Sequence, residues 1–268
     1  MLTRHPGTII SPFTGLLYRI YERRLLKQMD ASRFPRHVGV ILDGHRRYAR
    51  RSGLPNYVDS YLEGMRRFED FVDWSAALGI PAITGWVLSK ENLGRPAAQL
   101  EPYYEVLADL FRRLPQRCRR HKMGLQFIGS LDLLPASLVT AAKSAMEETG
   151  PATEGRNLTI AMGYGGRQEI VDACQSLVAE LSVGVENPSQ MAELIDSAGL
   201  ARHMYSAGTP DPDLLIRTSG ESRLSGFLLW QSAYAEFVFV DVYWPAFRRV
   251  DYLRALRDFS RRDRRYGQ

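Results

Sequence analysis

Cysteine is scarce in this chain, with only Cys118 and Cys174 among 268 residues. The two residues lie far apart in apparent helical segments and show no metal-ligand spacing. This excludes a disulfide scaffold and a cysteine-based zinc site. Thiols that stay free are typical of a reducing compartment, so we expect a cytoplasmic protein.

Long apolar runs and linkers are also lacking. No run approaches the roughly 18 uninterrupted apolar residues of a membrane-spanning helix. No internal repeat and no stretch rich in proline, glycine or serine divides the chain. We therefore expect one large domain over residues 31–268, preceded by a helical extension within residues 1–30.

The extension contains a segment, residues 12–28, in which apolar and basic side chains alternate at helical spacing. Its apolar positions are Leu16, Leu17, Ile20, Leu25 and Leu26. This pattern predicts an amphipathic helix. Such a helix either packs against the domain or makes a peripheral contact with a membrane, and the sequence leaves both open.

Neither sign of charge dominates, because 35 Lys and Arg face 30 Asp and Glu for a net charge of +5. This mild excess suits a nucleic acid, an anionic membrane or a phosphorylated small substrate. The arginines fall at the ends of predicted strands beside carboxylates, rather than on one continuous basic face with stacking aromatics. We therefore expect no nucleic-acid partner.

Segments of strand and helix character alternate from residue 37 to the C-terminus. The predicted strands cover residues 37–42, 82–88, 124–129, 157–162, 213–217 and 235–241. The helical segments between them are long enough for crossover connections. The sequence thus predicts a single α/β domain with a mostly parallel central sheet of about six strands, flanked by helices. Ligands of such sheets bind at the carboxyl ends of the strands.

The first predicted strand, VGVIL, is followed by Asp43, Gly44, His45, Arg46, Arg47 and Tyr48. A carboxylate can hold Mg²⁺, a glycine lets backbone N–H groups approach phosphate, and arginine binds phosphate through two parallel hydrogen bonds. This composition predicts a loop that binds a diphosphate. An ordinary Asp-Gly turn with surface arginines would, by itself, look the same.

Three later strands end in similar loops. The second strand runs into SKENLGRP at residues 89–96, and NLTIAM runs into YGGR at residues 164–167. The strongest pattern is DLLIRTSGE at residues 213–221, followed by Arg223 and Ser225. Arg217, Arg223 and the Ser225 hydroxyl can converge on a second diphosphate, and Glu236 is a candidate partner for Asp43 in an oxygen-ligand magnesium site.

These four loops, in this order and over residues 36–267, resemble the cis-prenyltransferase family of undecaprenyl diphosphate synthases and their short-chain actinobacterial relatives. The resemblance implies an undecaprenyl diphosphate synthase-like fold and a magnesium-dependent enzyme. Such an enzyme couples an allylic diphosphate with a second C5 prenyl diphosphate and releases pyrophosphate. The DDxxD motif of the all-helical trans-type synthases is absent.

The resemblance also assigns roles to individual residues. It implies catalytic roles for Asp43, His45 and Asn92, with Asp43 and Glu236 as ligands of Mg²⁺. It implies substrate binding by Gly44, Arg46, Arg47, Tyr48, Tyr61, Ser89, Glu91, Leu93, Arg95, Arg217, Arg223, Ser225, Arg265 and Gly267. The last two belong to a terminal Arg-Tyr-Gly tail that resembles a family tail reaching the neighbouring subunit's site, which implies a homodimer.

The sequence departs from the family pattern at several positions. His45 stands where the family usually has asparagine, and Leu88 is a branched residue in the predicted chain-length pocket, which favours a short product of C10–C15. Two alternatives stay open. One is head-to-middle coupling of two allylic diphosphates, as in lavandulyl-type members, and the other is a non-catalytic partner subunit. The donor length, the product geometry and the role of His45 also stay open.

The metal assignment is tested by Asp43→Ala. We expect this variant to lose prenyl transfer while keeping its fold, because a carboxylate that binds Mg²⁺ is removed from the loop. Product formation and circular dichroism measure the two properties. Normal turnover in a folded variant would overturn the assignment.

Overall fold

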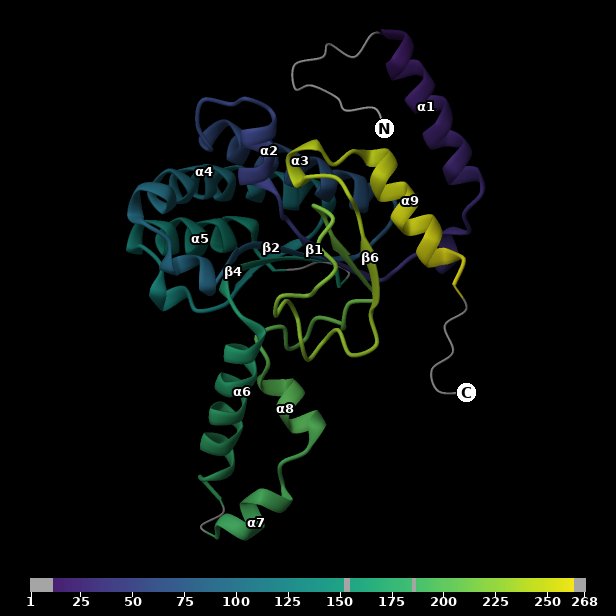
Figure 1. Ribbon diagram of the computed structural model, residues 1–268. Coiled ribbons are helices and arrows are strands. Elements are labelled where there is room, and N and C mark those ends of the chain that lie inside the picture. Colours follow the sequence, from purple (N-terminus) through teal and green to yellow (C-terminus); the bar gives the residue numbers. More distant parts are fainter. Residues whose placement is uncertain (1–11, 152–154, 185–186, 263–268) are drawn as a thin grey trace.

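The computed structural model describes residues 12–151, 155–184 and 187–262, and within them one sheet of six parallel strands forms the centre (Figure 1). The spatial order of the strands is β3-β4-β2-β1-β5-β6. Their bounds are β1 His37–Ile41, β2 Ala82–Ser89, β3 Gly124–Ile128, β4 Asn157–Tyr164, β5 Leu214–Arg217 and β6 Glu236–Phe239. The predicted α/β architecture is confirmed.

The central strands read as continuous apolar runs because helices and loops cover both faces of the sheet. All five residues of β1 are buried, as are seven of the eight in β2. In the parallel register, Val38 pairs with Ile83 of β2 on one side and Leu214 of β5 on the other. The strands β2, β1 and β5 therefore lie side by side and end at the same edge.

Helices α3, α4 and α5 cover one face of the sheet and enclose the main core with it (Figure 1). The helix bounds are α1 Pro12–Lys27, α2 His45–Arg51, α3 Val58–Ala77, α4 Ala97–His121, α5 Ala136–Thr149, α6 Gly166–Leu181, α7 Pro188–Glu193, α8 Ser197–His203 and α9 Arg249–Ser260. Helix α3 turns Met65, Phe68 and Phe71 toward the sheet, and each of these side chains is fully buried.

The second face carries a smaller core around Trp86, Tyr164 and Phe227. The Trp86 and Phe227 rings stack with centroids 5.2 Å apart, and Tyr164 meets both edge-on. Helices α6, α7 and α8 extend away from the sheet on this side as an arm (Figure 1). The site loops therefore lie on the body of the molecule, at the base of the arm.

Two local predictions need correction. Residues 45–48, expected to belong to a loop, lie in helix α2, whose sequence HRRYARR is too short and too polar to show helical periodicity. The helix docks through buried His45 and Ala49. The sequence also predicts a helical stretch near residues 188–205, but the structure has two short helices there, α7 and α8. They are separated where Asp196 caps the second by accepting a hydrogen bond from the Gly199 N–H.

Helix α1 packs against α9. Leu25 is 2% exposed within the main core, and the Tyr18 hydroxyl accepts a hydrogen bond of 2.7 Å from Arg248, just before α9. The opposite side of α1 is open, since Leu17 is 56% exposed. Among the described residues, no helix is long and apolar enough to cross a membrane.

This asymmetry of α1 predicts unequal costs for two similar substitutions. Leu25→Ala should lower the free energy of unfolding by about 2–5 kcal/mol, because it leaves a cavity in the core. Leu17→Ala should change it by no more than about 0.5 kcal/mol. Urea unfolding measures both. Equal effects would contradict the packing of α1 through Leu25.

Candidate active site

The site begins where three neighbouring strands end. In the register of the sheet, Ile41 of β1 lies opposite Trp86 of β2 and Arg217 of β5. Asp43 follows β1 directly, so its carboxylate reaches the same edge as Arg217. The carboxyl ends of these three strands therefore bring the motifs that follow them to one edge of the sheet. Ligands of open α/β sheets bind at this edge.

A buried hydroxyl fixes the turn that carries Asp43. The Asp43 N–H donates to Thr218 Oγ1 at 3.1 Å, and the Thr218 hydroxyl donates to the Asp43 carbonyl at 2.9 Å. Thr218 is fully buried. Gly44, which follows, has φ of +107°, and a Cβ there would lie 2.8 Å from the Tyr243 ring. Only glycine fits this turn without strain.

The Asp43 carboxylate is shared by two arginines. Arg217 donates to Oδ2 at 2.8 Å and Arg47 donates to Oδ1 at 3.1 Å. Burial by itself would raise the pKa of Asp43, but the hydrogen bond from Arg217 and the positive charges of both arginines outweigh it and lower the pKa. Asp43 is therefore ionised at neutral pH and available to a cation.

Glu221 links the arginines of the two loops. Its carboxylate accepts from Arg47 at 2.7 Å and pairs with Arg223 at 2.7 Å, and Arg47 also donates to Ser219 at 2.7 Å. The sequence interpretation quoted the motif that contains Thr218, Ser219 and Glu221 but assigned none of them to the site. Their part in it follows from tertiary contacts, for which the only sequence signal is their place in RTSGE.

Arg217 occupies a more enclosed place than Arg223. Arg217 is 6% exposed and donates to the Ser225 hydroxyl at 2.8 Å and to the Arg223 carbonyl. The Arg223 side chain is 67% exposed. Arg217 therefore organises the loop from within, whereas the exposed Arg223 guanidinium is held near Arg47 by its ion pair with Glu221.

Two adjoining cavities open at this edge and meet at Asp43 and Arg47. The first, of about 270 Å³, is lined by Leu42, Asp43, Gly44, His45, Arg46, Arg47, Arg50, Tyr61, Val87, Leu88, Asn92, Arg95 and Tyr103. The second, of about 340 Å³, is lined by Ile41, Leu42, Asp43, Arg47, Trp86, Val87, Ser89, Asn92, Arg95, Arg217, Glu221, Arg223 and Ser225. Arginines outnumber carboxylates in both, so both suit anions.

The pKa of Arg95 reflects the excess of positive charge in the first cavity. Burial lowers its pKa, and the nearby charge of Arg46 lowers it further. The two guanidinium groups thus repel each other across a cavity where an anion between them would be favourable. The residues predicted for the first diphosphate, Gly44, Arg46 and Arg47, line this cavity together with Tyr61 and Arg95, which were predicted to bind substrate.

His45 lies in the wall of the first cavity and faces helix α3. Burial lowers its pKa to about 4, although the Asp43 charge and a backbone hydrogen bond at Leu42 act against this. A Cβ added at Gly64 would lie 2.0 Å from His45 Nε2, and the Tyr61 and Tyr103 rings are 5.7 Å and 6.5 Å away. The imidazole is therefore neutral and closely packed against the backbone of α3.

Several predicted residues lie elsewhere. The Tyr48 hydroxyl donates to Glu63 at 3.0 Å, and Tyr48 lines neither cavity. Leu93 packs beside Gly163. Glu91 lines a separate hollow of about 730 Å³ near Gly165, which Ser89 and Asn92 also border. The predicted tail residues Arg265 and Gly267 lie outside the described part of the chain.

The predicted pairing of Glu236 with Asp43 is wrong within one chain. Glu236 begins β6 opposite Leu214, at the amino end of β5, whereas Asp43 follows the carboxyl end of β1. Its carboxylate accepts from Arg262 at 2.9 Å. The described residues contain no group of three His, Cys, Asp or Glu side chains suited to a metal. At the strand edge, Asp43 lines both cavities and Glu221 lines the second.

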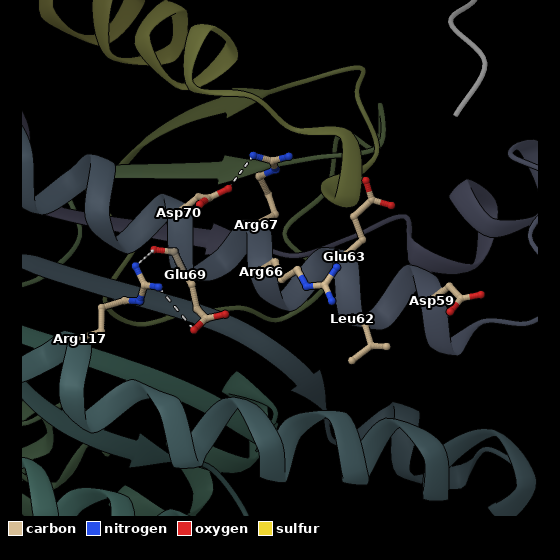
Figure 2. Close-up of a pocket in the computed structure, with 8 residues that line it drawn as sticks. All are labelled: Asp59, Leu62, Glu63, Arg66, Arg67, Glu69, Asp70 and Arg117. Atoms are coloured by element: carbon tan, nitrogen blue, oxygen red, sulfur yellow. Dashed lines mark hydrogen bonds and ion pairs between the residues drawn. The ribbon is translucent and has the colours of Figure 1, made fainter. Parts of the chain in front are cut away.

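Another hollow, of about 680 Å³, lies along the outer side of α3 (Figure 2). Figure 2 shows two of its ion pairs: Arg67 pairs with Asp70 at 2.8 Å, and Arg117 reaches Glu69 at 3.5 Å. Its lining holds four carboxylates and three arginines. None of the strand-end loops lines it. It therefore lacks both the excess of positive charge and the position that mark the two cavities at Asp43.

Comparison with known proteins decides the family. The family model described as "Putative undecaprenyl diphosphate synthase" matches residues 41–267. The chain belongs to this family. A (2Z,6E)-farnesyl diphosphate synthase of Thermobifida fusca is 48% identical to this cis-prenyltransferase, over 94% of this chain and 97% of the relative. Isoprenyl transferase 1 of Corynebacterium efficiens is 44% identical, over 94% and 98%.

A solved structure agrees with this assignment. Lavandulyl diphosphate synthase from Lavandula x intermedia, in complex with dimethylallyl diphosphate, superposes on the chain with a TM-score of 0.80 and 32% identity. The match covers 88% of this cis-prenyltransferase and 100% of the lavandulyl enzyme. The predicted family is confirmed, and the protein is an enzyme that transfers prenyl groups.

The contact between His45 and Gly64 generates a double-mutant test. Gly64→Ala should lower the free energy of unfolding by about 1–3 kcal/mol, because the new methyl group overlaps a buried ring. In a His45→Asn background the same change should cost clearly less, since the shorter side chain leaves room.

Urea unfolding of the four proteins gives the coupling between the two sites. Additive costs would show that the imidazole does not occupy the space above Gly64. Gly184→Ala, at a position outside the left-handed region where a Cβ would meet no atom within 4 Å, separates the steric cost from that of losing a glycine.

Proposed function

We propose that this enzyme couples an allylic diphosphate with a second C5 prenyl diphosphate, releases pyrophosphate and gives a C10–C15 product. The observation that carries the proposal is the pair of cationic cavities that share Asp43 and Arg47. Two adjacent anion sites are what a reaction between two diphosphates requires. The name of the Thermobifida fusca relative, a (2Z,6E)-farnesyl diphosphate synthase, supports a short product.

The allylic diphosphate would lie in the first cavity, against the backbone of Gly44 and the side chains of Arg46, Arg47 and Arg95. These positive groups stabilise negative charge as it develops on the leaving pyrophosphate. The second diphosphate would lie on Arg217, Arg223 and Ser225. Because Arg47 borders both cavities, it can contact either diphosphate.

Magnesium fits this arrangement through one carboxylate. Asp43 is ionised and reaches the shared wall of the cavities. Mg²⁺ in proteins is commonly held by one or two carboxylates together with substrate phosphate oxygens. We propose that Asp43 holds Mg²⁺ on the allylic diphosphate, where the ion neutralises the departing group. No second protein carboxylate is needed at this edge.

Asn92 is the residue we propose for proton removal. It lines both cavities, as the family resemblance requires of a group near the reacting carbon. The Ser89 hydroxyl accepts a hydrogen bond of 3.2 Å from the Asn92 N–H and so positions the turn. Glu91 lines the neighbouring hollow with both, and we propose an indirect role for it in placing this turn.

A short product agrees with the bulky buried side chains that line the first cavity. Leu88 is 1% exposed there, and the Tyr61 and Tyr103 rings pack with centroids 4.6 Å apart. The Tyr103 hydroxyl donates to the Val87 carbonyl at 2.6 Å, which anchors the ring. We propose that these groups limit chain growth, while the apolar wall keeps water from the allylic cation.

A second candidate is head-to-middle coupling of two allylic diphosphates. The observation that favours it is the likeness to lavandulyl diphosphate synthase. The departure at His45 does not favour it, because the imidazole Nε2 faces Gly64 rather than the shared wall of the cavities. A non-catalytic partner subunit is less favoured, because Asp43 and Arg217 keep their contact.

We further propose that residues 31–268 form the catalytic domain of a homodimer, with residues 1–30 as an added segment. In this dimer Arg265 and Gly267 would complete the neighbouring site. Two free cysteines are compatible with the proposed cytoplasmic location. Because the product carries an apolar chain, we also propose a peripheral contact with the membrane.

The choice between the two reactions is tested by substrate combinations. We expect product from isopentenyl diphosphate with geranyl diphosphate and none from dimethylallyl diphosphate alone. Mass spectrometry gives the chain length, and NMR gives the double-bond geometry. Product from dimethylallyl diphosphate alone would establish the irregular reaction, and Asp43→Ala serves as the control for enzyme-dependent turnover in both incubations.

A further inference from the structure

Helix α1 presents two different faces. One face packs on α9 through Leu25, Tyr18 and Tyr21, and Arg254 lies over the Tyr21 ring at 5.2 Å. On the other face Leu17 is 56% exposed and Ile20 is 55% exposed. Packing against the domain therefore accounts for only half of the amphipathic pattern of this helix.

The exposed face of α1 also carries positively charged side chains toward the C-terminal end of the helix. Leu17, Ile20, Arg24 and Lys27 recur every three or four residues and so lie along one side of the helix, with Arg23 beside them. We call these five residues the outer face of α1. Arg19 is exposed nearby.

Within the described part of the chain, these cations stand apart from the acidic side chains. Among the described residues, the side chains of Arg23, Arg24 and Lys27 make no ion pair or hydrogen bond. The cations of the packed side behave differently, since Arg249 pairs with Glu22 at 3.4 Å and Arg248 with Asp251 at 2.8 Å. The outer face therefore carries uncompensated charge beside exposed apolar surface.

We propose that the outer face of α1 docks on an anionic lipid bilayer. The proposal deepens the peripheral membrane contact given under the proposed function, because it names the surface and the lipid charge. Leu17 and Ile20 can enter the boundary between headgroups and acyl chains, while Arg23, Arg24 and Lys27 lie at the level of lipid phosphates. Charge complementarity selects anionic lipid over a neutral bilayer.

Vesicle co-sedimentation of the full-length protein tests the proposal. The protein should bind phosphatidylcholine vesicles that contain about one-third phosphatidylglycerol and bind pure phosphatidylcholine much more weakly. Binding should fall as salt rises, because the charges are exposed to solvent. Arg23→Gln combined with Arg24→Gln should lower partitioning about 25-fold, near fivefold for each charge.

The apolar part of the contact has a matched control. Leu17→Ser with Ile20→Ser should also weaken binding to the anionic vesicles. Val183→Ser with Leu194→Ser, at exposed apolar positions on the α6–α8 arm, should leave it unchanged. Binding that is absent in the unaltered protein, or equal in both double variants, would overturn the proposal.

Two further measurements distinguish a failure of membrane docking from a failure of the proposed function and from dimerisation through this face. Prenyl transfer without vesicles measures the proposed function separately, and it should be unchanged in the three double variants because none of them alters a residue of the two cavities. Gel filtration reports the oligomeric state. A dimer that dissociates in Leu17→Ser with Ile20→Ser would show that a second copy covers this face, which would also overturn the proposal.

Discussion

The ion pairs around Asp43 are the interaction on which the rest of the site depends. Six arginines line the two cavities: Arg46, Arg47, Arg50, Arg95, Arg217 and Arg223. Without counter-charges, a cluster of this kind would oppose folding through mutual repulsion. Asp43 and Glu221 form ion pairs with three of these arginines, Arg47, Arg217 and Arg223. All three still line a cavity. The protein can therefore keep a preformed cluster of cations at this edge, as the proposed binding of two diphosphates requires.

The sequence predicted those parts of the fold that depend on buried periodicity. The strands were recognisable because central parallel strands are apolar on both faces, as in β1 and β2. Helix α2 was not, because its seven residues are stabilised by docking His45 and Ala49 rather than by their own pattern. Local propensity carries little information about so short a helix.

The candidate site was predicted in part for a similar reason. Asp43 and Arg217 each end a recognisable strand, and the parallel sheet brings such ends together. Glu236 was misplaced because its motif reveals a strand but not which end of the strand faces the site. The hydroxyl of Thr218 and the link through Glu221 depend on contacts between segments more than 170 residues apart, which the spacing of motifs does not encode.

The arm formed by α6, α7 and α8 has a practical consequence for work on this enzyme. Cys174 is exposed on α6, whereas Cys118 is fully buried in α4, where burial raises the pKa of its thiol to about 12. A thiol-reactive dye should therefore attach at one position without engineering. Because that position lies on the arm and borders neither cavity, a fluorophore there could follow movements of the arm during turnover while the chemistry at Asp43 proceeds undisturbed.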